Sequence, residues 1–194
     1  MMTDMETIIR VVSAELGARA SNGRLLIAAV DGRCASGKTT LALHLRETMD
    51  CTVFHMDEFF LRPEQRTSRR LAEPGGNVDY ERFLQEVLLP LESGCSELTY
   101  RAFDCHTMSL LEPETVRIAP IIIVEGSYSC HPALREHYGM RIFMTTGREE
   151  QLRRITARNG ADGAERFRDL WIPLEEKYFE SCGVEKCCEL RFET

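Results

Sequence analysis

The chain has 194 residues, which is long enough for one sizeable hydrophobic core and short for two ordinary domains. Hydrophobic residues make up 43% of the chain and charged residues 28%, a balance typical of folded globular proteins rather than disordered ones. The 24 Lys and Arg against 31 Asp and Glu give a net charge of −7, which argues against general binding to nucleic acid or to an anionic membrane. We therefore expect one domain, residues 1–194, with neither of those partners.

The apolar stretches and the cysteines indicate the compartment. The longest apolar stretches, LLIAAV and IIIV, are far shorter than the roughly 20 residues that cross a bilayer. The N-terminal MMTDMETIIR does not have the basic and then apolar pattern of a signal peptide. The 8 cysteines are scattered without a CxxC pair, which favours free thiols in a reducing compartment. The expected location is the cytoplasm.

Strand and helix patterns alternate along the chain. The first helix is predicted from Thr3 to Gly17, with Thr3 and Glu6 as a capping box. Apolar runs without alternation predict strands that are covered on both faces. The strand candidates are RLLIAAV, CTVFHM, PIIIV, MRIFMTT and CCELRF. Helical periodicity recurs at 41–49, 80–91 and 167–178, with Trp171 expected in the core. The alternation predicts an α/β fold with a mostly parallel sheet and helices on both faces.

The segment DGRCASGKTT follows the first predicted strand and precedes a predicted helix. From Gly32 to Thr39 it matches G-x-x-x-x-G-K-S/T, the phosphate-binding P-loop. The glycines let backbone N–H groups surround an anion, and the following helix adds its positive N-terminal end. Lys38 is expected to reach the phosphates and the Thr39 hydroxyl to bind Mg²⁺. The predicted nucleotide-binding residues of this loop are Gly32, Ala35, Ser36, Gly37, Lys38, Thr39 and Thr40.

Two acids end neighbouring strand candidates. Asp57 follows CTVFHM and Glu125 ends PIIIVE. Because ligands bind at the carboxyl ends of parallel strands, we expect both acids to converge with Thr39. Glu125 is then a candidate metal ligand, and Asp57 a candidate base that orients an acceptor hydroxyl and takes its proton. Glu58 is the competing candidate for the base.

Six motifs together resemble one family. In chain order they are DGRCASGKTT, MDEFF, NVDYERF, YRAFDCHT, IIIVEGSY and LRRITARNG. They resemble the uridine kinase family of the phosphoribulokinase/uridine kinase group of P-loop kinases, from about Leu25 to Arg158. The resemblance implies a three-layer P-loop NTPase fold with five parallel strands and a short lid. It also implies phosphorylation of the 5′-hydroxyl of uridine or cytidine with ATP, or another nucleoside triphosphate, and Mg²⁺.

The resemblance also implies roles for single residues, each carried over from its motif. Asp57 matches the catalytic aspartate and Lys38 the P-loop lysine, while Asp79 matches an aspartate that binds ribose hydroxyls. Tyr100 and His106 match residues around the base, and Arg153 and Arg154 match the lid arginines that approach the phosphates. Arg158 is expected to contact the substrate. The spacing from Tyr100 to His106 is one residue longer than is usual in the family, and Arg158 stands one place late.

Several of these positions have a second interpretation. Asp79 could simply cap the helix that begins near Tyr80. Arg153 and Arg154 could pair with Glu149 and Glu150 on a solvated helix face, within a probable lid region at 148–166. His106 could pack rather than contact a base. In the substrate-side loop at 61–77, a solvated surface and a substrate clamp are both compatible with Arg62, Arg66, Arg69 and Arg70.

Three functions are compatible with these motifs. The first is a nucleoside kinase. The second is a P-loop kinase of another hydroxylated metabolite, such as pantothenate, a nicotinamide riboside or a sugar phosphate. The third is a nucleotide-dependent switch, which the absence of a guanine-reading N-K-x-D motif disfavours. A carboxylate at Asp79 would favour a ribose diol, whereas a sugar phosphate would call for arginines. The sequence leaves the oligomeric state open.

Overall fold

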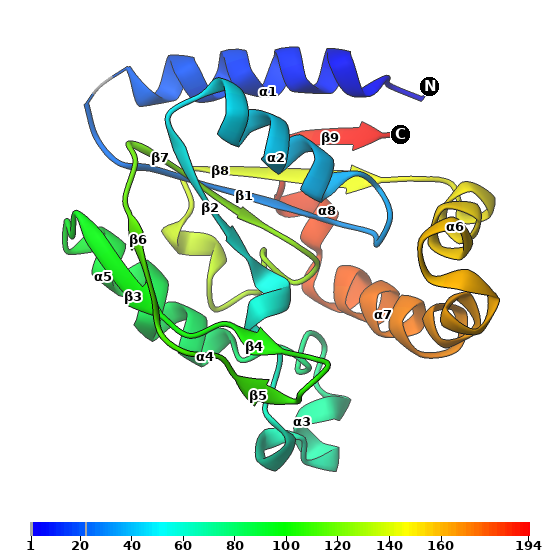
Figure 1. Cartoon of the computed structure of the whole chain (residues 1–194). Helices are drawn as coiled ribbons and strands as arrows, with labels where there is room; N and C mark the ends of the chain where they lie inside the picture. The colour runs from blue at the N-terminus through cyan, green and yellow to red at the C-terminus, as the bar shows by residue number, and fades with distance from the viewer. Residues whose placement is uncertain (1, 22) are drawn as a thin grey trace.

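Five parallel strands form the central sheet of the computed structural model, which describes residues 2–21 and 23–194 (Figure 1). Along the sheet their order is β2-β7-β1-β8-β9. They are β1 (Leu26–Gly32), β2 (Cys51–His55), β7 (Ile121–Glu125), β8 (Met140–Thr145) and β9 (Leu190–Glu193). Each coincides with a predicted strand, which confirms the parallel five-stranded sheet. The register places Val30 and His55 on either side of Glu125, so the carboxyl ends of the three central strands meet at one edge.

Helices cover both faces of this sheet. On one face, α1 (Met5–Ala20) and α2 (Lys38–Thr48) pack against alternate strand residues such as Ala28 and Val30. On the other face, the segment 80–92 and α7 (Ile172–Cys182) pack against Ile27 and Ala29 (Figure 1). Because both faces are covered, the central strands β1 and β7 are buried along their whole length, which is why LIAAV and IIIV read as continuous apolar runs.

The start of α1 differs from the predicted capping box. Asp4, not Thr3, is the N-cap, because its carboxylate accepts hydrogen bonds from the Thr7 backbone N–H and hydroxyl, both at 2.9 Å. The helix also passes through Gly17 and ends at Ala20, so the predicted end at Gly17 is wrong. Ile8, Val12 and Leu16 form its buried stripe.

The chain between β2 and β7 makes an excursion from the carboxyl edge of the sheet. It begins with a 3-10 turn (Met56–Phe59), a second 3-10 turn (Pro63–Gln65) and α3 (Ser68–Ala72), and a bridge from Phe60 to Val78 closes this loop. Its helix at 80–92 comprises α4 (Tyr80–Phe83), a π-helical turn (Leu84–Leu88) and α5 (Leu89–Glu92).

Two small antiparallel hairpins complete this excursion. They pair β3 (Glu97–Tyr100) with β6 (Glu114–Arg117), and β4 (Phe103–Asp104) with β5 (Ser109–Leu110). The sequence analysis does not predict them. Strands of two to four residues contain too few positions for a periodicity to be recognised.

The C-terminal part folds back onto the same edge. A 3-10 turn (Arg135–His137) precedes β8, and α6 (Arg148–Arg166) follows it with a kink at Gly160, where φ is 74°. A π-helical turn (Phe167–Trp171) leads into α7, and α8 (Val184–Cys187) precedes β9. The prediction that Trp171 lies in the core is wrong: α7 buries Ile172 and Tyr178 instead, and Trp171 is half-buried beside Phe60.

Within the described residues, no helix combines the length and the apolar character that crossing a membrane requires.

Candidate active site

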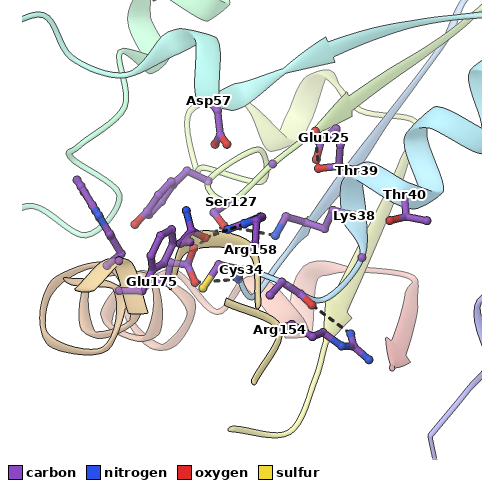
Figure 2. A pocket seen from close by; sticks show the side chains of 18 of the residues that line it. Cys34, Lys38, Thr39, Thr40, Asp57, Glu125, Ser127, Arg154, Arg158 and Glu175 are labelled. Carbon is purple, nitrogen blue, oxygen red and sulfur yellow. Dashed lines mark hydrogen bonds between the residues drawn. The ribbon is translucent and has the colours of Figure 1, made fainter. Parts of the chain in front are cut away.

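A pocket of about 990 Å³ opens at the carboxyl edge of the sheet. Its wall combines the P-loop, the ends of β2 and β7, and residues from α6 and α7 (Figure 2). The lining side chains with polar groups include Lys38, Thr39, Asp57, Glu125, Ser127 and Glu175. Residues that are far apart in the chain therefore share one cavity, at the edge where ligands bind in open parallel sheets.

The P-loop has the backbone shape of an anion cradle. A Cβ at Gly32 would lie 1.9 Å from the Met144 carbonyl oxygen of β8, so only glycine fits this approach. Gly37 is the N-cap of α2 with φ 94°, and Ala35 is also left-handed with φ 61°. Such turns point consecutive N–H groups into one concavity at the helix N-terminus. The residues present therefore fit the phosphates of a nucleotide.

Lys38 is held across this loop. Its side chain is buried, and Nζ donates to the carbonyl oxygens of Gly32 at 2.7 Å and Arg33 at 2.9 Å. The Ser127 hydroxyl lies 3.5 Å from Nζ. These contacts hold the ammonium group at the phosphate cradle through uncharged oxygens, where it can meet a bound phosphate.

Thr39 and Glu125 meet as predicted. The Thr39 hydroxyl donates to Glu125 Oε1 at 3.1 Å (Figure 2). His55 Nδ1 lies 2.6 Å from the same oxygen, and this hydrogen bond raises the pKa of His55. Mg²⁺ prefers one or two protein oxygens together with phosphates and water. A hydroxyl and a carboxylate beside the phosphate cradle fit that preference.

The two candidate bases point to different places. Asp57 lines the pocket across from Lys38 (Figure 2). Burial raises the pKa of Asp57, and the negative charge of Glu125 raises it further. Glu58 instead accepts a hydrogen bond from the Tyr100 hydroxyl at 2.7 Å. Of the two acids, Asp57 is therefore the one that can meet an acceptor hydroxyl in the pocket.

Glu175 is a pocket residue that the sequence analysis missed. Its carboxylate accepts hydrogen bonds from the Cys34 backbone N–H at 3.0 Å and the Ser127 hydroxyl at 2.7 Å. It thereby joins α7 to the P-loop and to the segment after β7. An acid in the apolar stripe of the last long helix was the available signal, because buried acids are rare unless they are paired.

Asp31, at the start of the glycine motif, was also not assigned a role. It is fully buried, and its two oxygens accept four hydrogen bonds of 2.6 to 3.1 Å. The donors are the backbone N–H groups of Gly32, Tyr128 and Cys130 and the hydroxyl of Tyr178. One carboxylate thus fastens the P-loop, the segment after β7 and α7 to each other.

The structure separates the predicted arginines. Arg154 lines the pocket and donates to Glu150 at 2.7 Å and to the Ala35 carbonyl oxygen at 3.1 Å. Arg158 also lines it. Arg153 is exposed and pairs with Glu150 at 2.6 Å, so the predicted pairing with Glu149 is wrong. Arg154 and Arg158, unlike Arg153, are placed where they can approach a nucleotide.

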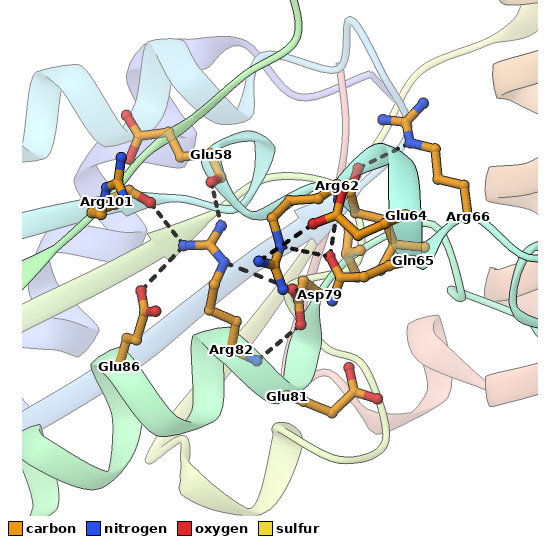
Figure 3. Close-up of polar contacts among 12 residues, drawn as sticks. Glu58, Arg62, Glu64, Gln65, Arg66, Asp79, Glu81, Arg82, Glu86 and Arg101 are labelled. Atoms are coloured by element: carbon orange, nitrogen blue, oxygen red, sulfur yellow. Dashed lines mark hydrogen bonds and ion pairs between the residues drawn. The ribbon is translucent and has the colours of Figure 1, made fainter. Parts of the chain in front are cut away.

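Asp79 and Tyr100 lie outside the pocket lining, within the described residues. Asp79 caps α4 by accepting the Arg82 backbone N–H at 3.1 Å, and its other oxygen accepts Gln65 Nε2 at 2.7 Å (Figure 3). The capping interpretation is confirmed, while ribose binding by Asp79 stays a prediction. Tyr100 is buried against Phe59.

His106 is exposed and lines the pocket. The packing interpretation of this residue is therefore wrong, and its contact with a base stays a prediction.

Comparison with known proteins shows similarity of fold. No family model and no curated protein matches the chain. A structure described as a possible uridine kinase from Bacillus stearothermophilus aligns with a TM-score of 0.67 and 19% identity, covering 93% of this chain and 98% of that one. The chain has the P-loop NTPase fold.

Two further structures share this fold. D-glycerate 3-kinase from Cryptococcus neoformans var. grubii aligns with a TM-score of 0.62 and 14% identity, covering 87% of each chain. YFH7 from Saccharomyces cerevisiae, described as a P-loop containing kinase with a circular permutation, aligns with a TM-score of 0.67 and 12% identity over 99% of each chain. Two of these descriptions name an acceptor, uridine in one and D-glycerate in the other, so the fold alone leaves the acceptor open.

Proposed function

We propose that the chain is a kinase that transfers the γ-phosphoryl group of ATP to a hydroxyl group of a small metabolite. The observation that carries this proposal is the convergence of three features in one pocket: Lys38 at the phosphate cradle, the Thr39 and Glu125 pair, and Asp57. Motors and switches need the first two, whereas a carboxylate facing the far side of the phosphates serves an acceptor hydroxyl.

Each residue has a distinct task in this reaction. The loop N–H groups and Lys38 bind the phosphates, while Arg154 and Arg158 approach them from α6. Mg²⁺, held by Thr39 and Glu125, would neutralise phosphate charge. Asp57 orients the acceptor hydroxyl and takes its proton as the oxygen bonds to the γ-phosphorus, and the bond to ADP breaks. Positioning and charge stabilisation supply most of the catalysis in phosphoryl transfer.

Uridine or cytidine is the acceptor that the sequence resemblance implies. Phe60 and Trp171 support it, because both line the pocket with ring centroids 6.3 Å apart and offer apolar surface to a base. An acceptor of another class is supported by a different residue, Arg66, which also lines the pocket. The cytoplasmic location stays a prediction, consistent with all eight cysteines being free.

An ATP-consumption screen tests the proposal. Purified protein is incubated with ATP and Mg²⁺ and with single nucleosides, vitamins, hydroxy acids and sugar phosphates, and products are identified by mass spectrometry. We expect one acceptor to gain a phosphate and the Lys38→Ala variant to form far less of that product. ATP binding with no phosphorylated product from any acceptor would favour the nucleotide-dependent switch.

A further inference from the structure

Arg66 differs from three other arginines of its region. Arg62, Arg70 and Arg82 each pair with a carboxylate, at 3.5, 2.6 and 3.1 Å. Arg66 lines the pocket, and in the described part of the chain it has no carboxylate partner. Its Nε donates to the Leu61 carbonyl oxygen at 2.9 Å, which fixes the guanidinium and leaves its outer nitrogens turned away from the neighbouring network (Figure 3).

Asn77 is anchored to the same residue as Arg66. Its backbone carbonyl oxygen accepts the Leu61 N–H at 3.2 Å, and Arg66 donates to the Leu61 carbonyl oxygen. Both Asn77 and Arg66 line the pocket. The Asn77 side chain also lies beside the hydroxyl of Tyr128, which is only 2% exposed, so these two polar groups can satisfy each other.

Arg66 and Asn77 line the same pocket as Asp57, and Cys105 lines it too. A ligand in this region therefore meets a carboxylate and a guanidinium. The guanidinium offers a planar pair of donors that matches a carboxylate or a phosphate, and it is less suited to a neutral ribose.

We propose that the acceptor is a hydroxylated anion, whose carboxylate or phosphate group binds Arg66 while its hydroxyl meets Asp57. This proposal rests on the kinase function proposed above and names its substrate class. Arg66 thus acts as the residue that selects the acceptor.

Binding to nucleotide-loaded protein tests the proposal directly. The P-loop is first saturated with Mg²⁺ and a non-hydrolysable ATP analogue, so that anionic probes cannot occupy it. D-glycerate, pantothenate and ribose 5-phosphate are then titrated calorimetrically, with uridine and cytidine as neutral probes. The first two probes report on a carboxylate and the third on a phosphate. We expect at least one anionic probe to bind.

Variants assign that binding to the site. Arg66→Ala should weaken the anion about 10- to 100-fold, because a charge-assisted hydrogen bond pair is lost. Arg66→Lys should restore part of the affinity, since it keeps the charge and loses the planar fork. Arg69→Ala is the matched control: it removes an exposed arginine of α3 that does not line the pocket, so affinity should be unchanged. Asn77→Asp should repel the anion and leave any binding of a neutral nucleoside in place.

The outcomes separate this proposal from the kinase function. If uridine or cytidine is phosphorylated equally well by the wild type and Arg66→Ala, and no anionic probe binds, the chain is a kinase and the anion proposal is overturned. If an anionic probe binds in an Arg66-dependent manner and is not phosphorylated, the anion site stands and the kinase function fails. Equal anion affinity in wild type, Arg66→Ala and Arg66→Lys proteins with unchanged melting temperatures also overturns the proposal.

Discussion

The two sides of the pocket differ in how firmly the protein holds its charged groups. On the phosphate side, Lys38 Nζ donates to two carbonyl oxygens, and Glu125 accepts a hydrogen bond from Thr39 and contacts His55. On the acceptor side, the Arg66 side chain donates one hydrogen bond, to the Leu61 carbonyl oxygen, and has no carboxylate partner in the part of the chain that the structure describes. Phosphates are common to many kinases and can be met by a prebuilt cradle. A specific acceptor can supply the anionic partner of Arg66 itself, and an analogue without an anionic group leaves Arg66 unpaired.

The largest expected effect is on the acceptor side, at Asp57. Asp57→Asn keeps the side-chain shape and loses the proton acceptor, so kcat should fall about 10²- to 10⁴-fold while the Kd for ATP changes little. Glu58→Gln is the matched control, because Glu58 contacts Tyr100 rather than the pocket. Steady-state kinetics and nucleotide titration on both variants measure this. A wild-type kcat in the Asp57→Asn variant would show that Asp57 is not the catalytic base.

On the phosphate side, Lys38→Ala should lower kcat about 10²- to 10³-fold, because a preorganised donor to the shifting phosphate charge is lost. The folded state should persist, since Nζ contacts only two carbonyl oxygens and one hydroxyl. Circular dichroism checks the fold alongside the rate measurement. Near-normal turnover in a folded Lys38→Ala protein would contradict the phosphate-cradle assignment.

The pH dependence of kcat/KM tests whether Asp57 is the base on the acceptor side. Burial and the charge of Glu125 raise the pKa of Asp57 above its ordinary value of 3.8. A base must be ionised, so kcat/KM should fall about tenfold per pH unit below that raised pKa, and the acid limb should appear at a higher pH than for a free aspartate. Glu58→Gln should keep the same limb.

The raised pKa of Asp57 also predicts how the stability of the fold depends on pH. A folded-state pKa above the unfolded one contributes stability below pH 3.8, and this contribution is lost as pH rises through the folded pKa. Above the raised pKa, where Asp57 is ionised, Asp57→Asn should therefore melt no lower than the wild type. A clear drop in its Tm in that pH range would show that the ionised carboxylate stabilises the fold.

A smaller effect separates two neighbouring arginines of the phosphate side. Arg154→Ala should raise the KM for ATP about tenfold, because Arg154 lines the pocket. Arg153→Ala should leave it unchanged, because that side chain is exposed and paired with Glu150. Equal effects of the two substitutions would mean that α6 moves enough to exchange their positions.

The smallest expected effect is that of replacing Asp79, which lies outside the pocket lining. Asp79→Ala should destabilise the fold by about 0.5–2 kcal/mol, because the N-cap of α4 is lost. Kinetic constants measured at low temperature should stay unchanged. A large rise in the KM of a ribonucleoside, together with lost discrimination against its 2′-deoxy form, would instead support the predicted ribose contact.

The difference between the phosphate side and the acceptor side of the pocket also bears on what could be predicted from the sequence. The strands could be recognised from continuous apolar runs, and the phosphate side from a local motif, since Gly32 to Thr39 are contiguous. Asp57 and Glu125 could be brought together because parallel strands end at one edge. The contact between Glu175 and the P-loop could not be predicted, because its partner Cys34 is 141 residues away and no local pattern encodes that contact. Trp171 was misplaced because periodicity locates an apolar stripe without telling a core from a ligand pocket.

The buried carboxylate of Asp31 should protect the backbone amides that donate to it from hydrogen exchange. The backbone N–H groups of Gly32, Tyr128 and Cys130 all donate to it, and it is inaccessible to solvent. Their protons can exchange with heavy water only when this carboxylate is uncovered, which requires the P-loop, the segment after β7 and α7 to come apart together. These three amides should therefore exchange at the rate of global unfolding, more slowly than loop amides usually do.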